Sequence, residues 1–92
     1  MGELAKIVVC IIDDDPSIQE IYRMKFIQEG FSVISAVNGE EGVALVRAKR
    51  PDIVFLDIQM PVKNGVEVLE MMKADPEISR IPVVILSNQD DQ

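Results

Sequence analysis

Four short apolar segments alternate with three segments of helical pattern along this chain of 92 residues. The apolar segments have the length and composition of buried strands, and they cover residues 6–12, 31–36, 53–57 and 83–87. The segments of helical pattern cover residues 17–29, 38–49 and 66–74; in the first, Ile18, Ile21, Tyr22 and Phe26 share one face. Uniformly apolar strands separated by amphipathic helices predict an α/β fold, a doubly wound parallel sheet with helices on both faces.

Composition and charge remove several classes of function. Nine basic and sixteen acidic residues give a net charge of −7, so we expect no direct binding to nucleic acid or to an anionic membrane. The absence of histidine excludes Ser-His-Asp catalysis and His-ligated zinc. The apolar run Ile7 to Ile12 is too short to span a membrane and the N-terminal residues lack a signal-peptide pattern, so we expect a cytoplasmic protein. Cys10 lies in that run and is expected to be a packed, reduced thiol.

Carboxylates follow two of the predicted strands. Asp13, Asp14 and Asp15 come directly after the first strand, and Asp57 ends the third. In a doubly wound sheet the functional site lies beyond the carboxyl ends of the strands, where the strand order reverses, so these side chains can meet in one cleft. Clustered carboxylates raise one another's pKa unless a cation is present, and oxygen ligands without His or Cys favour Mg²⁺ or Mn²⁺. Asp15 precedes Pro16 and is predicted to cap the first helix.

Three stretches carry a resemblance to a known family. "VVCIIDDDPSIQEIYRMKF", "PDIVFLDIQMPVKNGVEVL" and "IPVVILSNQ" resemble, in order and spacing, the receiver domain of the response regulators of two-component signalling. The resemblance runs from about Lys6 to Asp90. It implies one receiver domain over residues 1–92, truncated at its C-terminal end, with a flavodoxin-like sheet of strand order 2-1-3-4 from which the fifth strand is absent.

The resemblance also implies roles for individual residues. Asp57 would be the phosphoacceptor, taking a phosphoryl group from a sensor histidine kinase or a histidine phosphotransfer domain. Asp13, Asp14 and Asp57, together with the backbone carbonyl of Gln59, would hold Mg²⁺. Such a domain is not an enzyme in the usual sense, because it catalyses only its own phosphorylation and dephosphorylation.

Two further roles come with the resemblance. Ser87 follows the fourth apolar run and would donate a hydrogen bond to the phosphoryl group, acting as a switch. The first helix meets the phosphodonor in this family, so Ile18 and Tyr22 are either packing residues or docking residues.

The chain departs from the family pattern at its C-terminal end. Receivers continue past the fourth strand with a helix, a fifth strand that ends in a phosphoryl-binding lysine, and a last helix, whereas this sequence stops at Gln92. The fourth strand is therefore predicted to be an apolar sheet edge, which should not remain unpaired in water. A second copy of the chain could cover it as a homodimer, or the 92 residues could be part of a longer chain.

Two other classes of function stay open. A Mg²⁺-dependent phosphohydrolase of the haloacid dehalogenase type would use Asp13 as its nucleophile and Asp15 as its acid. An interaction module that is never phosphorylated would keep only the fold. Turnover of a phosphate ester would distinguish the first, and failure to bind Mg²⁺ would favour the second.

Overall fold

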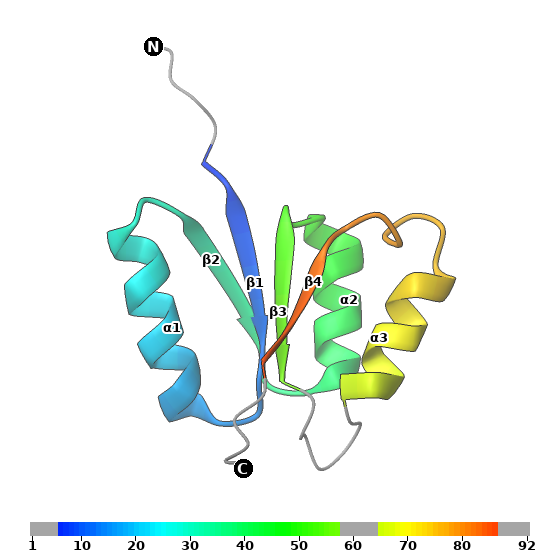
Figure 1. Ribbon diagram of the computed structural model, residues 1–92, viewed down its shortest axis with the longest axis horizontal. Coiled ribbons are helices and arrows are strands. Elements are labelled where there is room, and N and C mark those ends of the chain that lie inside the picture. Colours follow the sequence, from blue (N-terminus) through cyan, green and yellow to red (C-terminus); the bar gives the residue numbers. More distant parts are fainter. Residues whose placement is uncertain (1–5, 58–64, 87–92) are drawn as a thin grey trace.

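A computed structural model describes residues 6–57 and 65–86 of the chain. In chain order the elements are β1 (Val8–Ile12), α1 (Pro16–Gln28), β2 (Ser32–Ala36), α2 (Gly39–Lys49), β3 (Ile53–Asp57), α3 (Gly65–Ala74) and β4 (Val83–Leu86) (Figure 1). All neighbouring strands pair in parallel, in the order β2-β1-β3-β4. The doubly wound sheet and the strand order expected from the sequence are both confirmed.

Polar caps and one glycine set the ends of the first two helices. Asp15 is the N-cap of α1, and its carboxylate accepts the backbone N–H groups of Ser17 and Ile18 at 2.9 and 3.4 Å. The role predicted for Asp15 as a helix cap is therefore confirmed. Gly30, with φ of 97°, turns the chain away from α1 in a backbone region that favours glycine. Asn38 caps α2 by accepting the N–H of Glu41 at 2.9 Å.

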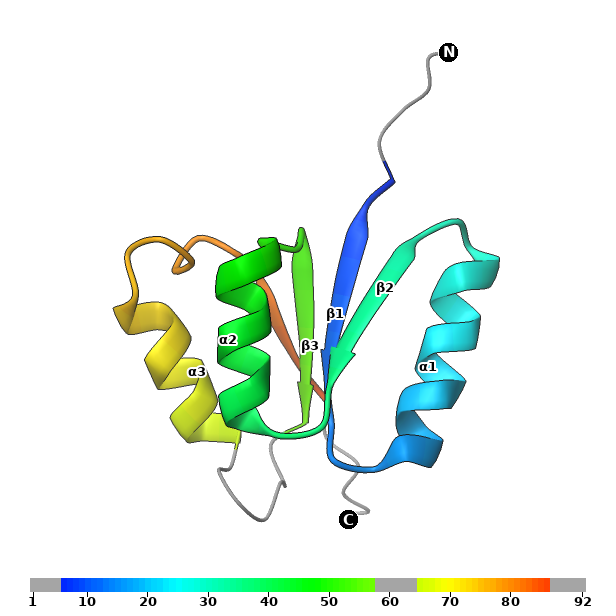
Figure 2. The same cartoon turned by 180° about the vertical axis from the view of Figure 1, so that it is seen from behind.

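The main core lies between the sheet and the helices α2 and α3, which Figure 2 shows together on one face. Its buried members are Cys10, Ile12, Val43, Val46, Val54, Leu56, Val68, Met72 and Ile78. Burial raises the pKa of the Cys10 thiol to about 12, so this group is a packed thiol as predicted and not a nucleophile. Helix α2 approaches β1 closely at Gly42, where an added Cβ would lie 2.5 Å from Cδ1 of Ile12.

The opposite face of the sheet is covered, within the described residues, by α1 alone. Phe26 of α1 packs on Phe55 of β3 and Phe31, with ring centroids 4.9 and 5.8 Å apart. Nevertheless, α1 contains no fully buried residue, and Ile21 is 60% exposed. Ile21, which the helical pattern places on the same face as Phe26, is therefore not part of the packed core, because the described residues cover this face of the sheet incompletely.

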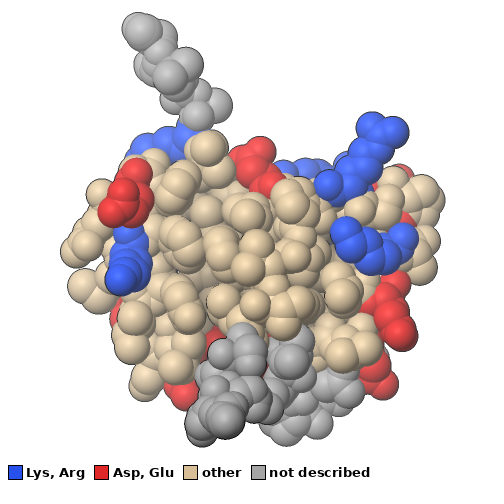
Figure 3. All heavy atoms as spheres, viewed as in Figure 1, with Lys and Arg blue, Asp and Glu red and all other residues tan. Residues whose placement is uncertain are grey.

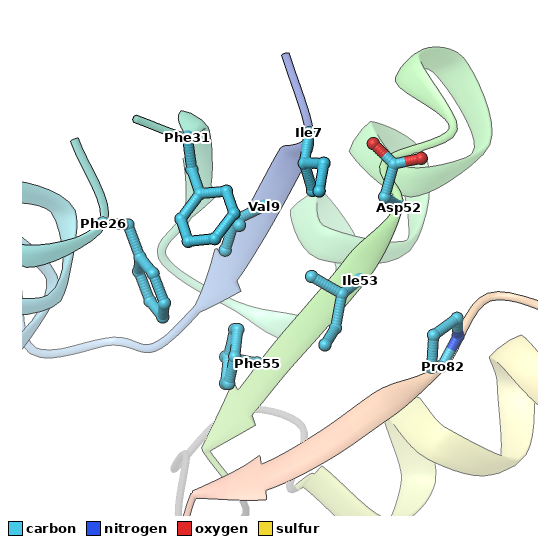
Figure 4. A pocket seen from close by; sticks show the side chains of 8 residues that line it. All are labelled: Ile7, Val9, Phe26, Phe31, Asp52, Ile53, Phe55 and Pro82. Carbon is cyan, nitrogen blue, oxygen red and sulfur yellow. The ribbon is translucent and has the colours of Figure 1, made fainter. Parts of the chain in front are cut away.

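An apolar hollow of about 360 Å³ lies on this incompletely covered face, beside α1 (Figure 4). Its walls are almost entirely apolar and come from residues at one end of the sheet: Ile7, Val9, Phe26, Phe31, Asp52, Ile53, Phe55 and Pro82. Figure 3 shows the same side of the molecule as a broad uncharged surface with charged residues around its margin. The expectation of helices on both faces is confirmed, with α2 and α3 on one face and α1 on the other, although among the described residues α1 leaves part of its face open.

Within residues 6–57 and 65–86, strand β4 is an edge of the sheet, as the sequence predicted. Its residues Val84 and Ile85 are 40% and 39% exposed although both are apolar. Among the helices of the described ranges, none is long and apolar enough to cross a membrane.

Candidate functional site at the carboxyl ends of the strands

The carboxyl ends of β1 and β3 bring three carboxylates together. The two strands are adjacent, and Ile12 pairs with Leu56, so Asp13 and Asp57 follow at the same level of the sheet. One carboxylate oxygen each from Asp13, Asp14 and Asp57 lie within 4.8 Å of one another. The expectation from the sequence that these residues meet is confirmed, and we call Asp13, Asp14 and Asp57 the acidic cluster.

Burial makes the negative charges of the acidic cluster unfavourable. Asp13 and Asp57 are 2% and 3% exposed, whereas Asp14 is exposed to solvent. The pKa of Asp13 is raised to about 6, mainly by burial and to a lesser degree by the charges of Asp57, Asp14 and Asp15, against the lowering effect of a hydrogen bond from the backbone N–H of Asp15. A bound cation would relieve this repulsion. The residues therefore fit a hard divalent ion such as Mg²⁺, which prefers carboxylate oxygens and retains several waters.

Backbone hydrogen bonds fix the position of Asp13. Its N–H donates to the carbonyl of Ala36 at 3.1 Å, and its carboxylate accepts the N–H of Asp15 at 2.9 Å. Its carbonyl accepts a hydrogen bond of 2.7 Å from the side-chain amide of Gln19. Gln19 was not singled out in the sequence, because a glutamine that binds backbone carbonyls leaves no motif.

Two of the predicted site residues, Gln59 and Ser87, lie outside the described residues. Ser87 directly follows Leu86, the residue of β4 that pairs with Asp57. Of the two predicted docking residues, Ile18 and Tyr22 are both partly buried on α1, and the ring of Tyr22 stacks on Phe26 at 6.4 Å. Both therefore contribute to packing and still present part of their surface.

The sequence of the chain matches the model of one protein family. Residues 9–92 match the response regulator receiver domain. The chain belongs to the response regulator receiver family. Membership implies that the domain accepts a phosphoryl group in two-component signalling, and receivers as a class are phosphoacceptors and not enzymes with separate substrates.

Named relatives agree with this assignment. Over 86 residues the chain is 40% identical to protein PilH of Pseudomonas aeruginosa, covering 91% of this chain and 69% of PilH. It is 35% identical over 83 residues to the DNA-binding response regulator MtrA of Mycolicibacterium smegmatis, covering 90% of this chain but 35% of MtrA. The chain thus spans about two thirds of one relative and one third of the other.

Solved structures show the same fold. The N-terminal domain of a response regulator receiver protein from Methanoculleus marisnigri superposes with a TM-score of 0.90 at 33% identity, covering 96% of this chain and 72% of that chain. The chemotaxis protein CheY4 of Vibrio cholerae superposes with a TM-score of 0.88 at 25% identity, covering 95% and 72%.

Proposed function

We propose that Asp57 is the phosphoacceptor of this receiver and that the acidic cluster holds Mg²⁺. The observation that supports this most directly is the meeting of Asp13, Asp14 and Asp57 at the carboxyl ends of two adjacent parallel strands, which is where doubly wound sheets bind their ligands. Asp57 is the last residue of β3 and is nearly buried, and hydrogen-bonded strands hold their side chains in place better than loops do.

The proposed reaction is an in-line transfer from a phosphohistidine donor. A carboxylate oxygen of Asp57 attacks phosphorus, the P–O bond forms as the N–P bond breaks, and the imidazole leaves and takes a proton from solvent. The product is an acyl phosphate, which water later hydrolyses to the free carboxylate and inorganic phosphate. A bound Mg²⁺ would neutralise negative charge on the transferred phosphoryl group. Asp13, Asp14 and the backbone carbonyl of Gln59 are the proposed ligands beside Asp57, and Ser87 is the proposed hydrogen-bond donor to the phosphoryl group.

The proposed donor is a sensor histidine kinase or a histidine phosphotransfer domain. Ile18 and Tyr22 are candidates for its docking site, because they lie on the helix that begins directly after the acidic cluster and remain partly exposed. A cytoplasmic location, where such donors act, is part of this proposal.

The phosphohydrolase alternative has weaker support. It requires Asp15 to act as an acid on a bound substrate, yet the Asp15 carboxylate accepts the first N–H groups of α1 and is not part of the acidic cluster. The interaction module without phosphorylation also has weaker support. Burying two carboxylates such as Asp13 and Asp57 costs free energy, and this alternative gives the pair no role that would explain the cost.

The test is the intact mass of the chain after incubation with Mg²⁺ and a small-molecule phosphodonor, followed by peptide mapping. We expect one phosphoryl adduct on Asp57, and none on Asp57→Asn. Asp15→Asn is the matched control, because asparagine caps a helix as well as aspartate does and should leave labelling unchanged. Labelling of Asp13, together with turnover of a phosphate ester, would instead support the phosphohydrolase.

We also propose that a second copy of the chain covers β4. In the part of the chain that the structure describes, this strand is a sheet edge with two exposed apolar residues, Val84 and Ile85, and the sheet face beside it is uncharged (Figure 3). Two identical edges can pair about a twofold axis, which would satisfy the outer backbone groups of both strands.

A further inference from the structure

Gln19 lies one turn into α1 and directs its side-chain amide back at the ends of two strands. Nε2 donates to the carbonyl oxygen of Asp13 at 2.7 Å and to the carbonyl oxygen of Ala36 at 2.5 Å. Both acceptors are carbonyls, and only the NH₂ group of the amide has two hydrogens to donate. The chemistry of the partners therefore fixes the orientation of the amide.

These two carbonyl groups lie at the carboxyl ends of β1 and β2, next to the acidic cluster. Ala36 is the last residue of β2, and its carbonyl also accepts the backbone N–H of Asp13 at 3.1 Å. The carbonyl of Asp13 is part of the peptide group that joins Asp13 to Asp14. Holding that peptide plane restrains the directions in which both side chains leave the backbone.

We infer that Gln19 is a positioning residue for the acidic cluster. By tying α1 to the ends of β1 and β2, its amide holds Asp13 and Asp14 in the arrangement that receives a divalent cation near Asp57. This inference rests on the proposed function, because a cation at the cluster is part of that proposal. Residues that orient metal ligands without touching the metal commonly change metal affinity about 10- to 100-fold when they are replaced.

The chain offers a matched control for this role. Gln28 is the other glutamine of α1, it is exposed, and it lies at the end of the helix far from the cluster along the chain. Replacing either glutamine by methionine keeps the side-chain length and a good helix former but removes the amide. Gln19→Met therefore removes two hydrogen bonds to the site, whereas Gln28→Met makes the same chemical change elsewhere on the helix.

The first measurement is Mg²⁺ affinity by calorimetry on the full chain. We expect the Kd of Gln19→Met for Mg²⁺ to rise about tenfold or more, and that of Gln28→Met to stay within about twofold of the wild type. An unchanged Kd in a folded Gln19→Met protein would overturn the inference.

The second measurement needs neither a variant nor a metal. In the wild type we expect the side-chain amide protons of Gln19 to exchange with solvent more slowly than those of Gln28, by NMR in the absence of Mg²⁺. Equal exchange would overturn the inference even if Gln19→Met failed to fold. If the Gln19 amide protons are protected but the chain binds no Mg²⁺, the contact of Gln19 is upheld and the proposed metal site is overturned. Failure of the inference can therefore be distinguished from failure of the proposed function.

Discussion

Asp13 and Asp57 stand at the same level on adjacent parallel strands, 2% and 3% exposed, with carboxylate oxygens within 4.8 Å of each other. Two carboxylates this close and this buried destabilise each other when both are ionised. Asp13 nevertheless keeps its position, because its backbone N–H, its carboxylate and its carbonyl oxygen each make a hydrogen bond. The protein therefore stores an unfavourable interaction at the place where a cation and a phosphoryl group are proposed to bind.

The first prediction concerns pH. The pKa of Asp13 is raised by burial and by neighbouring carboxylates to about 6, above its ordinary value of 3.8. A raised pKa means that the folded state binds the proton more tightly than the unfolded state does. Its contribution to stability is therefore complete below about pH 4 and is lost as pH rises through about 6.

We expect the free energy of unfolding, measured with urea without metal, to fall between pH 5 and pH 7.5. Asp13→Asn is the control, because its amide stays neutral and should remove most of this fall. Saturating Mg²⁺ should also remove it, since a bound cation favours the ionised carboxylates. A wild type whose stability follows the same pH profile as Asp13→Asn would contradict the prediction.

The second prediction separates two neighbouring aspartates. Asp14→Asn should weaken Mg²⁺ binding at least tenfold, because it removes a charged oxygen from the acidic cluster. Asp15→Asn should leave the affinity nearly unchanged, because Asp15 caps α1 and asparagine does this equally well. Calorimetric titration of both variants checks this, and equal losses would mean that the metal site extends to Asp15.

The sequence predicted the strands and the acidic cluster well for a physical reason. Short apolar runs that alternate with amphipathic helices, such as the run at the start of Ile53–Asp57, are typical of buried parallel strands, and the topology of a parallel sheet brings the strand ends together. Two features were beyond its reach. Whether Ile21 is buried depends on what covers the sheet face on which α1 packs. Helical periodicity shows which residues share a face of the helix, but not what covers that face. The contacts of Gln19 are made to backbone carbonyls of distant residues, and a backbone acceptor has no signature in sequence.

The third prediction concerns the close approach of α2 to β1. A Cβ at Gly42 would lie 2.5 and 2.9 Å from Cδ1 and Cγ1 of Ile12, so Gly42→Ala must displace that side chain. Overpacking of this kind lowers the free energy of unfolding by about 1–3 kcal/mol. The better helix propensity of alanine offsets up to about 1 kcal/mol of this loss. We expect a net loss of about 1 kcal/mol in the free energy of unfolding, measured with urea.

A second substitution tests whether Ile12 is the cause. Ile12→Val removes Cδ1, and on its own it should cost about 0.5–1.5 kcal/mol through the space it leaves. In the Gly42→Ala background the same change should cost less, because the new methyl group occupies part of that space. Strict additivity of the two substitutions would show that the clash at Gly42 is relieved by some other movement.

The last prediction concerns the edge of the sheet. If a second copy covers β4, the wild type should have the mass of a dimer in light scattering, in proportions that rise with concentration. Val84→Lys should shift the mass to that of a monomer, because a lysine on an edge strand opposes edge-to-edge pairing. Val66→Lys is the matched control, since Val66 is also a half-exposed valine, 54% exposed, but lies on α3. A monomeric wild type, or a dimer that Val84→Lys leaves intact, would show that β4 is not the surface through which copies associate.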